Sequence, residues 1–149
     1  MQDIDDLLEC YNARTRDEQR IANEQHKTVA KARDKARTIL EAIALPPLKE
    51  VCNSLTAKGH RSEVREQFEF STPGVDLVFA PIRNEQFPGI QSVLCFMVAD
   101  DGIAHITSKV MTRSNKSYKT NCEVALDDLS ASKVRQRAIE FIESVLSAN

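Results

Sequence analysis

The sequence predicts an α+β fold in which helices accompany a five-stranded antiparallel meander sheet. Three observations lead to this prediction: a long helical stretch opens the chain, five short segments of alternating polarity follow, and an amphipathic helix closes it. The chain has 149 residues, of which 42% are hydrophobic and 28% charged, ordinary values for one globular domain. We expect one structural unit, with a helical arm over 1–58 and the sheet with its closing helix over 62–149.

The opening stretch predicts one long helix over 3–44, because it contains neither proline nor glycine. Such a helix measures roughly 60 Å, at 1.5 Å per residue. Apolar or small residues recur in alternating steps of three and four, which is typical of a helix that packs against a partner helix. This proposed self-association seam comprises Ile4, Leu8, Tyr11, Ala22, Val29, Ala32 and Ala36. We expect the seam to form a homodimer through a coiled coil; an overhanging helix and a break in its polar middle are the alternatives.

Charge divides the helical arm into two halves. Residues 1–26 carry three Arg against seven Asp and Glu, a net charge of −4, whereas residues 27–65 carry nine Lys and Arg against four acids, a net charge of +5. Two such helices in antiparallel orientation bring opposite charges together, and in parallel orientation they bring like charges together. The pattern therefore favours antiparallel pairing.

The pair Pro46-Pro47 predicts that the long helix ends at Ala44 or Leu45, because a residue before proline is displaced from the helical region. Pro47 suits the first turn of a second, short helix over 47–58, where its missing N–H costs little. We expect this helix to turn back against the end of the first one, on Ile39, Leu40 and Ile43.

Five segments with a two-residue alternation predict strands in the second half of the chain. They run over 64–70, 75–82, 90–99, 103–112 and 117–126. The sequences Ser-Thr-Pro-Gly at 71–74 and Asp-Asp-Gly at 100–102 are typical of tight turns between strands. The closing helix, over 130–147, carries Val134, Ala138, Phe141, Ile142 and Val145 on one side.

The strand patterns also predict which residues share a sheet face. The third strand is apolar on both faces, which suits the central position of a meander. We expect the closing helix to cover the face that holds Leu94, Phe96, Val98, Ala104, Ile106, Val110, Tyr118, Cys122 and Val124. The second face is half apolar and holds Val93, Cys95, Met97, His105 and Thr107. The helices, a second chain or a small-molecule ligand has to shield it.

The chemistry-bearing residues give little indication of an enzyme. The chain has no phosphate-binding or nucleophile motif, and its three histidines and four cysteines show no metal-ligand spacing. Cys95, His105 and Glu123 are the one set that the strand register could bring together for nucleophilic catalysis. Cysteine is more often a buried, inert residue, so we expect no catalytic, cofactor or metal site.

The basic part of the long helix is the candidate for nucleic-acid binding, through Lys27, Lys31, Arg33, Lys35 and Arg37. The negative net charge and the absence of interleaved aromatic residues argue against it. No apolar run is long enough to predict a membrane span, and the acidic start lacks a secretory pattern. Scattered cysteines then favour reduced thiols in the cytoplasm.

The sequence thus predicts a cytoplasmic, non-enzymatic protein–protein interaction module, comparable in general plan with chaperone-, antitoxin- or immunity-like accessory proteins. It would self-associate through its long helix and bind a protein partner of unknown identity. A nucleic-acid-associated accessory protein and a small-molecule binder on the second sheet face are the alternatives.

Overall fold

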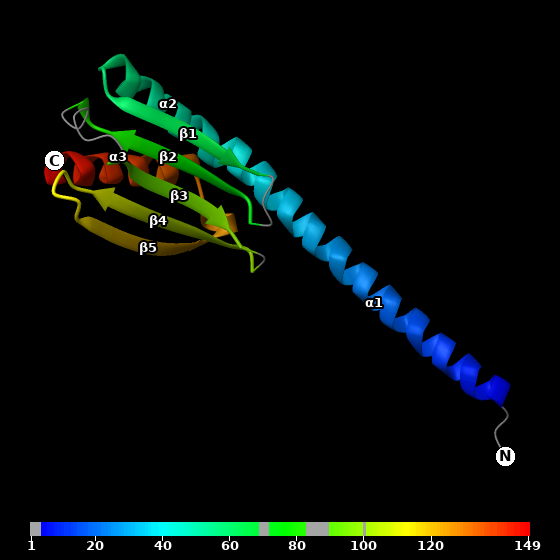
Figure 1. The fold of residues 1–149 in the computed structure, drawn as a ribbon. Helices are drawn as coiled ribbons and strands as arrows, with labels where there is room; N and C mark the ends of the chain where they lie inside the picture. Colours follow the sequence, from blue (N-terminus) through cyan, green and yellow to red (C-terminus); the bar gives the residue numbers. More distant parts are fainter. Residues whose placement is uncertain (1–3, 69–71, 83–89, 100) are drawn as a thin grey trace. The chain divides into compact units, whose positions relative to one another are not determined.

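The computed structural model describes residues 4–68, 72–82, 90–99 and 101–149, without the side chains of 26, 28 and 29 (Figure 1). Its helical segments are α1 (Ile4–Ile39), the π-helical segment η1 (Leu40–Ala44), α2 (Leu45–Ala57), the 3-10 segment η3 (Leu126–Asp128) and α3 (Ala131–Ala148). Its strands are β1 (Arg61–Gln67), β2 (Gly74–Ala80), β3 (Ser92–Val98), β4 (Ile103–Met111) and β5 (Ser117–Ala125). These elements confirm the predicted α+β fold with a long N-terminal helix, an antiparallel sheet and a C-terminal helix.

The chain divides into two compact units, Met1–Ala32 and Arg33–Asn149. In its described residues the first unit is a segment of α1 alone. The second unit contains the end of α1, the other helices, the whole sheet and the hydrophobic core.

The helix does not end at Ala44 or Leu45, so the predicted stop is wrong. Leu45 keeps helical angles, φ −63° and ψ −47°, and its N–H bonds to the carbonyl of Leu40, five residues earlier. Pro46 and Pro47 follow in the first turn of α2. A proline provides no N–H and its ring crowds the carbonyl four residues before it. The wider π-helical turn relieves that crowding, and the backbone passes the proline pair without leaving the helical region.

The predicted turn-back of the short helix is therefore absent as well. Ala36, Leu40, Ala44 and Leu48 instead form one row, four residues apart, and all four are buried in the core. The sheet and α3, rather than the end of the first helix, pack against α2.

The five strands pair in the order β1-β2-β3-β4-β5, and every neighbouring pair is antiparallel, as predicted for a meander. The observed strands differ from the predicted ranges by up to three residues at their ends. The predicted end of the first strand (69–70) and the first residue of each predicted turn (71 and 100) lie outside the described residues.

The core lies on one face of this sheet. α2 packs against β1 and β2, and α3 packs against β3 and β4. Both helices lie behind the sheet in the view of Figure 1. The register places Phe96 opposite Ile106, and Ile106 opposite Cys122, which confirms the predicted composition of this face. Its largest fully buried side chains are Phe79, Phe96, Leu40, Leu48, Leu77 and Val75.

β3 is central, but it is not buried on both faces as the sequence suggested. Its residues alternate between buried and half-buried, because both helices cover the same side of the sheet. β2 is the strand whose residues are all buried. On the second face Asp76 lies in register between Arg65 of β1 and Cys95 of β3, and Val78 lies between Glu63 and Val93.

Candidate functional site

The N-terminal part of α1 exposes a row of large apolar side chains. Ile4, Leu7, Leu8 and Tyr11 are 71%, 53%, 54% and 65% exposed. Their spacing of three, four and seven residues places them on one side of the helix. Such a contiguous apolar row on a helix surface is typical of an interaction site rather than of a solvated face.

The rest of the predicted seam is mixed. Ala22 and Ala32 are exposed, and the side chain of Val29 lies outside the described residues. Ala36 is 2% exposed and belongs to the chain's own core. We therefore remove Ala36 from the proposed seam, because its burial in the chain's own core leaves it inaccessible to another molecule.

The basic residues of α1 are all exposed on the helix surface, but some already have acidic neighbours. The amine of Lys35 lies 3.8 Å from a carboxylate oxygen of Asp127. Arg37 donates to Glu41 at 3.2 Å, and its guanidinium lies 5.6 Å from the ring centre of Phe68. These pairs compete with phosphate contacts, and no aromatic side chain follows Lys27 or Lys31 for base stacking.

The second sheet face brings the predicted ligand residues into three rows. Thr107 lies opposite Cys95 on one side and Asn121 on the other. In the next row His105 lies between Met97 and Glu123, and in the row on the other side Lys109 lies between Val93 and Lys119. The sequence thus placed Val93, Cys95, Met97, His105 and Thr107 on the correct face, whereas the two lysines beside them were missed.

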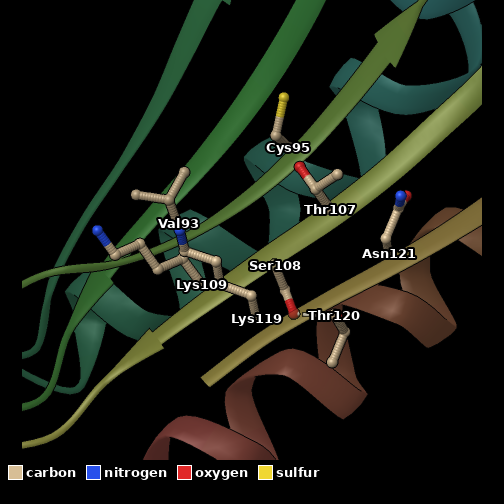
Figure 2. A pocket seen from close by; sticks show the side chains of 8 residues that line it. All are labelled: Val93, Cys95, Thr107, Ser108, Lys109, Lys119, Thr120 and Asn121. Atoms are coloured by element: carbon tan, nitrogen blue, oxygen red, sulfur yellow. Dashed lines mark hydrogen bonds between the residues drawn. The ribbon is translucent and has the colours of Figure 1, made fainter. Parts of the chain in front are cut away.

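A hollow of about 380 Å³ lies over this face, and Figure 2 shows the side chains that line it. Its lining consists of Val93, Cys95, Thr107, Ser108, Lys109, Lys119, Thr120 and Asn121. The hydroxyls of Ser108 and Thr120 hydrogen-bond to each other beneath it. The hollow is open to solvent, whereas a small-molecule site usually encloses most of its ligand.

Cys95 lacks the properties of a catalytic nucleophile. Three causes raise the pKa of the Cys95 thiol from 9.0 to about 12: burial is the largest, then the hydrogen bond to Asp76, then the negative charge of Asp76. A hydrogen bond from Thr107 lowers the pKa and so opposes the change. The reactive form of cysteine is the thiolate, so a thiol with this pKa is inert at neutral pH.

The predicted neighbours His105 and Glu123 do lie side by side. The His105 Nδ1 atom is 3.6 Å from Glu123 Oε1, and its Nε2 atom is 3.9 Å from Asp101 Oδ2. Cys95, however, lies opposite Thr107 and not opposite His105. The register therefore separates the thiol from the imidazole, and the three residues form no nucleophile–base pair.

Asp76 is a buried acidic residue that sequence reasoning overlooked. It is 9% exposed; its Oδ2 atom accepts a 2.6 Å hydrogen bond from Gln67, and its Oδ1 atom has no partner in the described residues. Arg65 lies opposite it in register but donates to Glu63. The only sequence signal is a carboxylate in an otherwise apolar strand, between Val75 and Leu77.

Lys109 and Lys119 form the most unusual contact on this face. They lie directly opposite each other on β4 and β5. Within the described part of the chain, no carboxylate lies within ion-pair distance of either amine. Like charges directly opposite each other on neighbouring strands are destabilising. The two amines therefore have no carboxylate partner among the described residues.

Over residues 4–68, 72–82, 90–99 and 101–149, no group of three or more His, Cys, Asp or Glu side chains has the arrangement of a metal site. No described helix has the length and apolar character that crossing a membrane requires. Comparisons with protein families, with curated proteins and with solved structures found no match.

Proposed function

We propose that this chain is a non-enzymatic, cytoplasmic interaction module that self-associates through α1 and binds a protein partner. The observation that carries the proposal is the apolar row of Ile4, Leu7, Leu8 and Tyr11, each more than half exposed. In unit Met1–Ala32 every described side chain is exposed or half-buried, so this row packs against nothing in its own unit.

The size of the row suggests a moderate affinity. Complete burial of one large apolar side chain contributes about 1.5–3 kcal/mol, and these are already partly covered. Two copies of the row then contribute on the order of 10 kcal/mol, against an association cost of about 4–15 kcal/mol. At the low end of that cost about 6 kcal/mol remains, which corresponds to dissociation at tens of micromolar.

The charge halves of the arm support an antiparallel arrangement. Residues 1–26 have a net charge of −4 (three Arg against seven acids), and residues 27–39, the rest of α1, have +4 (five Lys and Arg against one acid). An antiparallel dimer brings these halves together and weakens as salt screens the attraction, whereas a parallel dimer strengthens with salt. Changing Lys27, Lys31 and Lys35 to Glu is expected to weaken the antiparallel dimer, and the same variant tests nucleic-acid binding.

Sedimentation velocity of the full chain between about 1 and 100 μM tests the proposal. We expect the Leu8→Glu variant to shift dissociation to at least tenfold higher concentration, because it places a charge within the row. Leu146→Glu is the matched control, since Leu146 is a 48% exposed leucine on α3. A sedimentation coefficient that Leu8→Glu leaves unchanged would contradict the proposal.

A further inference from the structure

β5 is an edge strand with an unpaired side. It pairs with β4 alone among the described strands. Two flanking bonds show which of its backbone groups point outward: the Thr112 N–H donates to Lys116, and the Leu126 N–H donates to Gly102. In an antiparallel ladder the bonded pairs recur every second residue. The even-numbered residues of β5 therefore bond to β4, and the odd-numbered ones present their N–H and C=O groups to the free edge.

The sequence of this edge is complementary to itself. Asn121 is the midpoint of Ser117–Ala125. When two copies of β5 are laid antiparallel about Asn121, Lys119 of one lies opposite Glu123 of the other, and the same contact recurs on the other side of the axis. All five outward-pointing residues then form bonded pairs, each exchanging two backbone hydrogen bonds.

Other registers lose this match. Moving one strand by two residues leaves Lys119 opposite Asn121 or Ala125, without an acidic partner. A shift of one strand by four residues puts Lys119 opposite Lys119 of the other copy, or Glu123 opposite Glu123. One register alone thus combines full overlap of the strand with two pairs of opposite charges.

The same pairing accounts for two features of the isolated chain. The Lys109–Lys119 contact lacks a carboxylate in the described residues, and Glu123 of a second copy would extend that row with negative charge. On the core face Tyr118 is 58% exposed, and the pairing places it opposite Val124 of the second copy. Aromatic and β-branched residues are a stabilising cross-strand pair.

We propose that β5 pairs antiparallel with β5 of a second copy, centred on Asn121, so that one sheet continues through both chains. Charged edge residues such as Lys119 normally prevent strands from pairing with other chains. Here the spacing of Lys119 and Glu123 fits a second copy of the same edge. This interface is independent of the one proposed on α1. Since both are two-fold, their combination builds assemblies larger than a dimer.

Exchanging the charges at 119 and 123 tests the pairing. The exchange is made in the Leu8→Glu variant, because Leu8→Glu weakens the α1 contact. Lys119→Glu and Glu123→Lys each place like charges opposite one another, and each is expected to raise the dimer dissociation constant at least tenfold. The double variant restores opposite charges and is expected to recover the dimer. Lys133→Glu, on the exposed side of α3, is the control for net charge.

Two results would overturn the pairing: a double variant as weak as the single ones, or single variants with unaltered association. The outcomes also separate this proposal from the α1 proposal. If only β5 associates, Leu8→Glu made in the wild-type chain leaves the size of the assembly unchanged, whereas the β5 variants reduce it. If only α1 associates, Leu8→Glu reduces the size of the assembly and the β5 variants leave it unchanged.

A backbone test avoids charge altogether. Asn121→Pro removes an outward N–H that β4 does not use, so the fold is expected to persist while the dimer is lost. In hydrogen exchange, the amides of Lys119, Asn121 and Glu123 should gain protection as concentration rises, while those of Tyr118 and Thr120 stay protected throughout. Equal, concentration-independent exchange of the three odd-numbered amides would refute the proposal.

Discussion

The protonated state of Cys95 leads to a quantitative prediction for alkylation. At pH 8 a thiol with a pKa of 9.0 is about one-tenth ionised, whereas one with the pKa of about 12 expected for Cys95 is about one part in ten thousand ionised. Because only the thiolate reacts, iodoacetamide should modify Cys95 roughly a thousandfold more slowly than an ordinary thiol. The exposed Cys10 serves as the internal reference.

Replacing Asp76 separates the causes of this pKa. Asp76→Asn removes the negative charge beside the thiol, and the pKa of Cys95 should fall. It should stay above 9.0, because burial is the largest cause and persists in the variant. The alkylation rate at pH 8 should therefore rise, but not to the rate of Cys10. Glu63→Gln, a change of the same kind on the same face, should leave it unaltered.

Mass spectrometry of alkylated peptides between pH 7 and 12 measures both rates. Modification of Cys95 at a rate within tenfold of Cys10 at pH 8, in the folded protein, would refute the reasoning. The same pKa gives the sign of a stability change. The folded state holds this proton more tightly than the unfolded state, so the contribution is present below pH 9 and is lost as pH rises towards 12.

Three further substitutions test how the fold is held together, each by chemical denaturation. Leu40→Ala should cost about 2–5 kcal/mol, since Leu40 is fully buried in the π-helical segment, while the exposed Glu41→Ala should cost little. Ser130→Ala should cost about 0.5–2 kcal/mol, because the Ser130 hydroxyl accepts the Lys133 N–H at the start of α3; a destabilisation equal to that of Ser132→Ala would contradict this role. Gly102→Ala should cost about 1–2 kcal/mol, because Gly102 has φ +75°, and an unchanged midpoint would argue against a strained turn.

The fold was predictable where local pattern and tertiary packing agree. The two-residue alternation of Leu94, Phe96 and Val98 specified both a strand and the face that the core covers. The glycine of the Asp-Asp-Gly turn adopts the positive φ that such a turn needs. The Ser130 cap likewise fixed the start of α3 within a residue.

The parts that escaped prediction depend on contacts distant in sequence. The Pro46-Pro47 pair opposes a helix locally, but burial of Leu40 and Leu48 in one core holds the backbone helical across it. Ala36 follows the same heptad spacing as Ala22, and only the folded core distinguishes their environments. The Lys109–Lys119 contact needs the register of β4 and β5, which turn length alone leaves uncertain by a residue.

Because both helices cover the same face of the sheet, the residues of a strand alternate between positions that face the core and positions that face away from it. In β3, β4 and β5, even numbers face the core and odd numbers face away from it. In β3 and β4 the core therefore holds most even positions to apolar or small residues, while the odd positions, half-buried or exposed, tolerate more substitutions. In a saturation library scored for soluble expression, the tolerance to substitution should alternate from one residue to the next along these strands. The face away from the core can therefore change in sequence while the core stays the same.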